Sequence, residues 1–151
     1  MIKIAILGDI GSGKSFIAKQ FGCPVFNADN EVKKIYKNDR NCYKKLNKAI
    51  PKHILSFPIN KKEISKSILS NHKNLKKVIK IVHPLVRIKM NKFIDKNKKK
   101  KLIVFDIPLL LENKIEKKVN ILIFVEAKKK EIIKNLKKRK NYIIGHLVES
   151  L

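Results

Sequence analysis

The residues with the clearest chemical capacity lie near the N-terminus, where Gly8-Asp9-Ile10-Gly11-Ser12-Gly13-Lys14-Ser15 forms a Gly-x-x-x-x-Gly-Lys-Ser sequence. An apolar run over residues 4–7 precedes it and a helical pattern over residues 16–21 follows, which is the strand–loop–helix context of a phosphate-binding loop. In such a loop, backbone N–H groups surround a polyphosphate. Lys14 is expected to reach the β- and γ-phosphates, and the Ser15 hydroxyl to ligate Mg²⁺. The sequence therefore predicts a nucleotide-phosphate site at residues 8–15.

Two acidic residues follow other predicted strands. Asp29 comes after a short strand over residues 24–26, and Asp106 ends a strand over residues 102–105. Because parallel strands joined by right-handed crossovers end at one edge of the sheet, both should lie beside the loop. The chain has only 12 acidic residues, so two at this edge are informative. Asp106 is interpreted as a residue near the metal or substrate, or as a strand-end cap. Asp29 is also a candidate N-cap of the helix that follows it.

The remaining elements predict an α/β fold with a parallel sheet and flanking helices. Strands are expected over residues 2–7 and 121–125 as well, and the second of these is continuously apolar, as buried parallel strands are. Residues 40–97 carry several helical segments, one of which is expected to begin near Pro84, since proline suits a first helical turn. A Lys-rich helix is expected over residues 128–140. The helical stretch is therefore interpreted as an insertion into an α/β core.

The composition limits the classes of molecule that the chain is expected to bind. The formal net charge is +25, but nearly all of the basic charge is lysine, whereas specific nucleic-acid recognition usually depends on arginine. We expect anionic nucleotides to be attracted and RNA to bind without sequence preference at low salt. No apolar run approaches a membrane span, and the N-terminus lacks the pattern of a signal peptide. Cys23 and Cys42 have no metal-ligand spacing, so we expect a cytoplasmic protein with reduced cysteines that serve packing.

Four motifs make the chain resemble the dephospho-CoA kinase family over about residues 2–140. The motifs are Ile6-Leu7-Gly8-Asp9-Ile10-Gly11-Ser12-Gly13-Lys14-Ser15, Asn27-Ala28-Asp29, Val82-His83-Pro84-Leu85 and Asp106-Ile107-Pro108-Leu109-Leu110-Leu111-Glu112. Many nucleotide-binding families share the loop, whereas the four motifs in this order are specific. The resemblance implies a P-loop kinase-type parallel sheet with an inserted helical substrate region. It implies one domain over residues 1–151, with the core at 1–39 and 101–127, the insertion at 40–100 and a partial lid at 128–151.

The resemblance also implies an enzyme and its substrates. ATP and Mg²⁺ would bind at residues 8–15, and the γ-phosphoryl group would move to the ribose 3′-hydroxyl of dephospho-CoA, giving coenzyme A. Catalytic roles then fall to Lys14, to Asp29 as the base and to Arg139 as a lid arginine that clamps phosphate. The implied substrate contacts are Asp29, His83, Arg87, Asp106 and Glu112. A structural role is the alternative for His83, and a solvated surface position is the alternative for Arg87 and Arg139.

The chain departs from the family pattern at three places. Asn27 stands where the family has aspartate, and it keeps the hydrogen-bonding capacity without the charge, so Asn27→Asp is expected to be neutral or mildly favourable. Asn135 stands at the first of two lid arginines. The family continues beyond Leu151, so the chain is expected to lack a C-terminal portion and to be a poor enzyme. The strand over residues 121–125 is then expected to form an uncovered apolar edge. The alternatives are another P-loop kinase for small molecules or nucleotides, and a non-catalytic basic protein that binds nucleotide or RNA.

Overall fold

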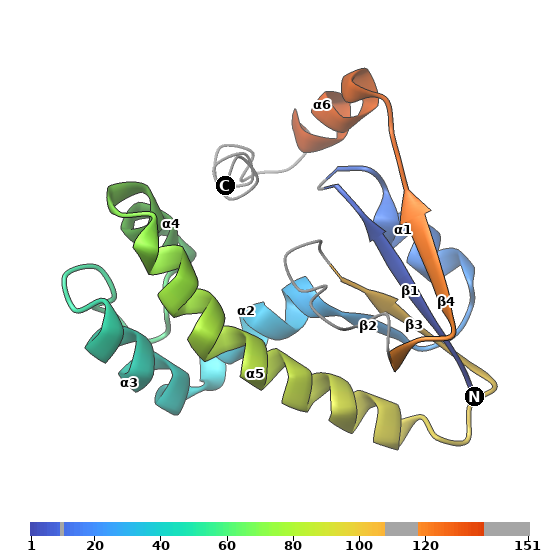
Figure 1. The fold of residues 1–151 in the computed structure, drawn as a ribbon, viewed down its shortest axis with the longest axis horizontal. Helices are drawn as coiled ribbons and strands as arrows, with labels where there is room; N and C mark the ends of the chain where they lie inside the picture. Colours follow the sequence, from blue (N-terminus) through green and yellow to red (C-terminus); the bar gives the residue numbers. More distant parts are fainter. Residues whose placement is uncertain (10, 108–117, 138–151) are drawn as a thin grey trace.

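A four-stranded parallel sheet forms the centre of the computed structural model, which describes residues 1–9, 11–107 and 118–137. The strands are β1 (Ile2–Gly8), β2 (Val25–Asn27), β3 (Leu102–Asp106) and β4 (Ile121–Val125), in the order β2-β3-β1-β4. β1 is central and pairs with both β3 and β4 (Figure 1). All pairings are parallel, which confirms the predicted α/β fold and places the C-terminal ends of the four strands at one edge.

The helices lie on both faces of this sheet. They are α1 (Lys14–Gln20), α2 (Ala28–Asn38), α3 (Arg40–Ala49), α4 (Lys61–Ser70), α5 (Lys73–Lys96) and α6 (Lys129–Lys137). Helices α3 to α5 form an arm: α3, α4 and the N-terminal part of α5 extend away from the sheet, whereas the C-terminal part of α5 runs alongside it (Figure 1). Helix α6 lies beyond the C-terminal ends of the strands (Figure 1). The helical segments predicted between residues 40 and 97 are therefore present as three helices.

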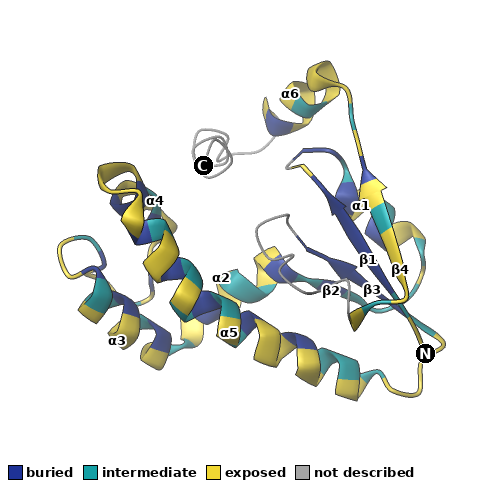
Figure 2. Ribbon diagram, in the orientation of Figure 1, coloured by how far each residue is buried: buried dark blue, intermediate teal, exposed yellow. Residues whose placement is uncertain are grey.

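The alternation of side chains along the strands divides the core into two layers. Ile4 and Ile6 pack on one face with Ala18 of α1, whereas Ala5 packs on the other face with the arm and α2. On that second face Phe26 and Phe105 form a cluster with Phe93 of α5, with ring centroids 5.5–6.1 Å apart. Burial is highest at the centre of the sheet (Figure 2), so the strand ends that carry the polar residues rest on a rigid base.

The prediction of a helix beginning near Pro84 was wrong, because α5 runs without interruption from Lys73 to Lys96 and Pro84 lies inside it. A proline in a helix removes one hydrogen bond and leaves the carbonyl four residues earlier without its usual partner. Pro84 and Lys80 are both exposed, so water can satisfy that carbonyl. Meanwhile Val82 and Val86, on either side of the proline, are buried in one stripe of the helix. Packing of this stripe holds the helix together across the proline.

β4 is apolar throughout, as predicted, and it matches the expectation of an uncovered apolar edge. It is an edge strand of the described sheet, and Ile121, Leu122 and Phe124 are exposed, the last to 54% (Figure 2). Only Val125, at its C-terminal end, is buried. A continuous apolar run reports the character of a strand but not whether both of its faces are covered. Within the described residues, no helix is long and apolar enough to cross a membrane.

Candidate functional site

The glycine loop connects β1 to α1 at the C-terminal edge of the sheet, as predicted. Gly8 ends β1 with φ +141°, and a Cβ there would lie 2.2 Å from the carbonyl oxygen of Val125. The approach of β4 to β1 therefore depends on the missing side chain. Gly13 has φ +97° in the left-handed region and is the N-cap of α1, so the helix begins with Lys14. The turn thus aims the N-terminus of α1 at the loop, and such helix ends attract anions.

Lys14 and Ser12 are the buried polar residues of this loop. Lys14 is 9% exposed, and its ammonium donates to the carbonyl oxygen of Asp9 at 2.6 Å. The same carbonyl accepts the backbone N–H of Ser12 at 3.1 Å. The Ser12 hydroxyl is buried and has no hydrogen-bond partner among the described residues. The loop therefore presents a fixed ammonium and an unsatisfied hydroxyl within two residues of each other.

Asp106 joins the loop to the next strand. It ends β3, is 4% exposed, and accepts two hydrogen bonds on Oδ2: from Ser15 Oγ at 2.6 Å and from Asn27 Nδ2 at 2.5 Å. A buried carboxylate needs such donors to offset its lost hydration. The structure confirms that Asp106 lies beside the loop, as the topology predicted, and it places Asn27 in the same cluster.

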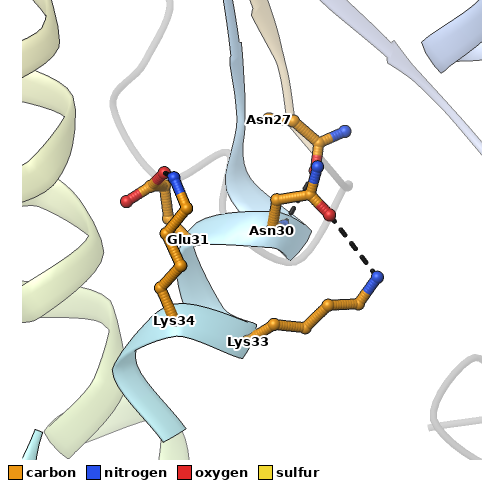
Figure 3. A network of polar contacts seen from close by, with 5 residues as sticks. All are labelled: Asn27, Asn30, Glu31, Lys33 and Lys34. Carbon is orange, nitrogen blue, oxygen red and sulfur yellow. Dashed lines mark hydrogen bonds and ion pairs between the residues drawn. The ribbon is translucent and has the colours of Figure 1, made fainter. Parts of the chain in front are cut away.

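The start of α2 contradicts one interpretation of Asp29, that of a helix N-cap. Asn27 is the N-cap, and its side-chain oxygen accepts the N–H of Asn30 at 2.8 Å (Figure 3). Asp29 therefore is not the cap; it lies exposed in the first helical turn, two residues from the cluster around Asp106. Partial burial lowers the pKa of the Lys61 ammonium, and the charge of Lys33 lowers it further. The nearby Asp29 carboxylate acts in the opposite direction and offsets part of this effect. Asp29 thus stands among cationic side chains.

Helix α6 covers the outer side of the loop. The side chain of Asn135 donates to the carbonyl oxygen of Gly11 at 2.8 Å, and Leu136 is 2% exposed. A Cβ at Gly11 would lie 3.1 Å from Leu136 Cγ and 3.2 Å from the carbonyl oxygen of Ile132, so this glycine also permits close packing. Sequence reasoning treated Asn135 only as a missing arginine and did not predict its contact with the loop backbone.

His83 and Arg87 lie one turn apart on α5, which packs against α2. His83 is half-buried, and this burial, with the charge of Arg87, lowers its pKa, so the ring is neutral near pH 7. No hydrogen bond among the described residues joins either side chain to Asp29 or Asp106, so their substrate roles stay predictions. Ile10, Glu112 and Arg139 lie outside the described residues.

The loop motif implies Mg²⁺, and the residues present fit this ion. The Ser15 hydroxyl and the Asp106 carboxylate offer adjacent oxygen atoms, which are the ligands that Mg²⁺ prefers. Among the described residues no three or more His, Cys, Asp or Glu gather into a metal-binding group. Mg²⁺ is usually held by one or two protein ligands together with substrate phosphates and water, so a small donor set of this kind suits it.

Comparison with known proteins decides the relationship of the chain. Residues 2–150 match the dephospho-CoA kinase family. The chain belongs to that family. A dephospho-CoA kinase of Wolbachia pipientis wMel is 37% identical over 129 residues, which cover 82% of this chain and 66% of that protein. One from the Wolbachia of Brugia malayi is 39% identical over the same coverage. The chain thus spans just under two thirds of the length of these family members.

Solved structures show the same fold. The crystal structure of TT1252 from Thermus thermophilus superposes with a TM-score of 0.74 at 24% identity, covering 98% of this chain and 77% of that one. The dephospho-CoA kinase from Campylobacter jejuni gives 0.58 at 18% identity, covering 90% of this chain and 96% of that one. The P-loop kinase-type parallel sheet with flanking helices, which the resemblance implied, is thereby confirmed.

Proposed function

We propose that the chain catalyses ATP-dependent phosphorylation of the ribose 3′-hydroxyl of dephospho-CoA, the reaction for which its relatives are named. The observation that carries the proposal is the buried Asp106, hydrogen-bonded to both Ser15 of the loop and Asn27 beside Asp29. Phosphoryl transfer is achieved mostly by positioning and charge stabilisation. This cluster joins the glycine loop to the start of the helix that carries Asp29, which supports phosphate and acceptor sites at the same edge of the sheet.

In this proposal the loop binds the phosphates of ATP. Loop N–H groups and the start of α1 face the polyphosphate, and Lys14 exchanges its contact with the Asp9 carbonyl for phosphate oxygens. The unsatisfied Ser12 hydroxyl gains a partner in the same step. Ser15 and Asp106 would hold Mg²⁺, which neutralises charge on the β- and γ-phosphates when bound.

The acceptor lies on the α2 side. We assign Asp29 as the general base, because it is an exposed carboxylate in the first turn of the helix that starts from the Asp106 cluster. It would accept the proton of the attacking hydroxyl. Lys33 and Lys61, whose charges act on the same region, would attract the diphosphate of dephospho-CoA. Residues 40–100 form the proposed substrate region, with His83 and Arg87 as further contacts, and 128–151 the proposed lid.

The test is phosphate transfer from radiolabelled ATP by the purified 151-residue chain. Dephospho-CoA, AMP and pantothenate would serve as separate acceptors, and the Lys14→Ala variant as the blank. Label appearing in coenzyme A, and absent with the variant, is the expected result. Transfer to another acceptor would favour a different P-loop kinase, and transfer to none would overturn the proposal.

A basic nucleotide- or RNA-binding protein without catalysis is the other candidate, favoured by the net charge of +25. RNA binding that persists with sequence preference at physiological salt would support it, whereas binding that falls steeply with salt reports charge alone.

We propose a cytoplasmic location, which suits an ATP-consuming reaction and the two free cysteines, Cys23 and Cys42.

A further inference from the structure

The two ends of the Asn27 side chain serve different parts of the site. Its oxygen accepts the N–H of Asn30 at 2.8 Å and so caps α2 (Figure 3). Because a backbone N–H can only donate, this contact fixes which atom of the amide is oxygen. The nitrogen therefore faces Asp106 and donates to its Oδ2 at 2.5 Å. An N-cap needs only the first contact; the second connects α2 to β3.

The second contact orients the carboxylate that faces the loop. Asp106 Oδ2 accepts from Ser15 Oγ as well as from Asn27, and the residue is 4% exposed. Hydrogen bonds to a charged acceptor are shorter and stronger than those between neutral groups. Of the two side chains that donate to Asp106, only Ser15 would remain to orient the carboxylate if the Asn27 donor were removed.

We propose that Asn27 is a positioning residue that sets the place of Asp29 relative to the Ser15–Asp106 pair. One end of its amide determines where the helix carrying Asp29 begins, and the other end holds the carboxylate that faces the loop. The inference rests on the proposed function, in which Asp29 serves the acceptor and Ser15 serves the nucleotide. A misplacement of about 1 Å between such groups can cost about a hundredfold in rate.

Two substitutions separate the amide nitrogen from the cap. Asn27→Asp keeps an N-cap oxygen of nearly the same shape, since aspartate caps helices as well as asparagine does. The aspartate side chain has no N–H to donate to Asp106, and it places a second carboxylate next to the carboxylate of Asp106. This contact reverses the expectation from the sequence that Asn27→Asp would be neutral. Asn27→Ser also retains a capping oxygen and removes the amide nitrogen that reaches Asp106, without adding charge.

Asn120→Asp is the matched control. Asn120 directly precedes β4, at the opposite end of the strands from the glycine loop, and its side-chain oxygen accepts the N–H of Lys3 at 2.9 Å. Among the described residues this is its side chain's single hydrogen bond, so the same chemical change occurs outside the site. Any effect common to Asn27→Asp and Asn120→Asp belongs to the loss of an amide or to net charge.

The experiment compares the parent and the three variants by kcat and KM with dephospho-CoA, by Tm, and by calorimetric ADP affinity with Mg²⁺ and with EDTA. For Asn27→Asp and Asn27→Ser we expect kcat to fall about tenfold or more. We expect the gain in ADP affinity on adding Mg²⁺ to shrink severalfold. Tm should fall by about 3 °C or more for Asn27→Asp, and Asn120→Asp should match the parent throughout.

Parental kcat and an unchanged Mg²⁺-dependent gain in both Asn27 variants would show that Asn27 is only a cap, and would overturn the inference. A variant that fails to fold is replaced in this comparison by the other one. If the parent transfers no phosphate to dephospho-CoA, the proposed function fails separately. The ratio of the ADP affinity with Mg²⁺ to that with EDTA then still decides whether Asn27 positions Asp106, because this ratio does not involve the acceptor.

Discussion

Asp29→Asn separates the catalytic role of Asp29 from its structural one. The substitution is nearly isosteric and removes a negative charge and a proton acceptor. Asp29 is exposed in the first turn of α2, and Asn27, not Asp29, supplies the N-cap contact. The structural loss is therefore limited to the favourable interaction of a carboxylate with the helix N-terminus, about 0.3–1 kcal/mol. For a chain of this length, that loss lowers Tm by about 1–4 °C.

The catalytic loss should be much larger. Removing a general base typically lowers the rate by about 10²–10⁴-fold, which corresponds to about 3–5 kcal/mol in the barrier. We therefore expect kcat with dephospho-CoA to fall by about a hundredfold or more, with ATP affinity little changed. A difference of that size cannot come from the loss of helix stabilisation alone.

Glu31→Gln is the control within the same turn of α2. Glu31 also loses its interaction with the helix N-terminus, and it loses an ion pair with Lys34 at 2.6 Å, which is worth about 0.2–1 kcal/mol at a surface (Figure 3). We expect its Tm to fall at least as far as that of Asp29→Asn, while kcat is retained. Equal kcat in the two variants, or a collapse of ATP binding in Asp29→Asn, would refute the assignment of Asp29 as the base.

Three further outcomes are expected. Lys14→Ala should abolish phosphoryl transfer in the label assay while circular dichroism shows an intact fold, because Lys14 lies in the loop; equal activity would contradict its role. Gly8→Ala sets a Cβ 2.2 Å from the Val125 carbonyl oxygen at φ +141°, so it should cost about 2 kcal/mol or more and lower Tm by about 4–8 °C; an unchanged Tm would show that β4 moves freely. Burial and the charge of Arg87 lower the pKa of His83 below the unfolded value of about 6.5, so acidification from pH 7.5 to 5.5 protonates the unfolded state first. Tm of the parent should thus fall more over this range than that of His83→Gln, and parallel curves would exclude the effect.

Local patterns predicted most of the fold. The apolar runs of β1 and β3, and the glycine loop between β1 and α1, depend on neighbouring residues and were found where the sequence placed them. The helix start predicted at Pro84 was wrong, because burial of the apolar stripe from Val78 to Met90 stabilises α5 by more than one lost hydrogen bond destabilises it. The exposure of β4 depends on what covers its faces, which its own five residues do not encode.

The candidate site was predictable in position but not in its connections. Topology alone brings Asp29 and Asp106 to the loop edge. The hydrogen bond between Asn27 and Asp106 joins residues 79 apart, and the one between Asn135 and Gly11 joins residues 124 apart. Both use an amide donor, a group that occurs throughout the chain and carries no motif. Only their placement in three dimensions distinguishes these asparagines from the many on the surface.

The central position of β1 has a consequence for synthesis on the ribosome. Its partner strands begin at Leu102 and Ile121, so the first strand made waits longest for its neighbours. At about 5–20 residues per second, roughly 5–20 s separate β1 from β3 during translation. The helices of residues 28–96 make contacts that are closer in sequence and can form meanwhile, since local contacts form faster than distant ones. The nascent chain therefore passes through a stage in which the arm is structured while the central strand β1 waits unpaired, the interval in which chaperones would have most to protect.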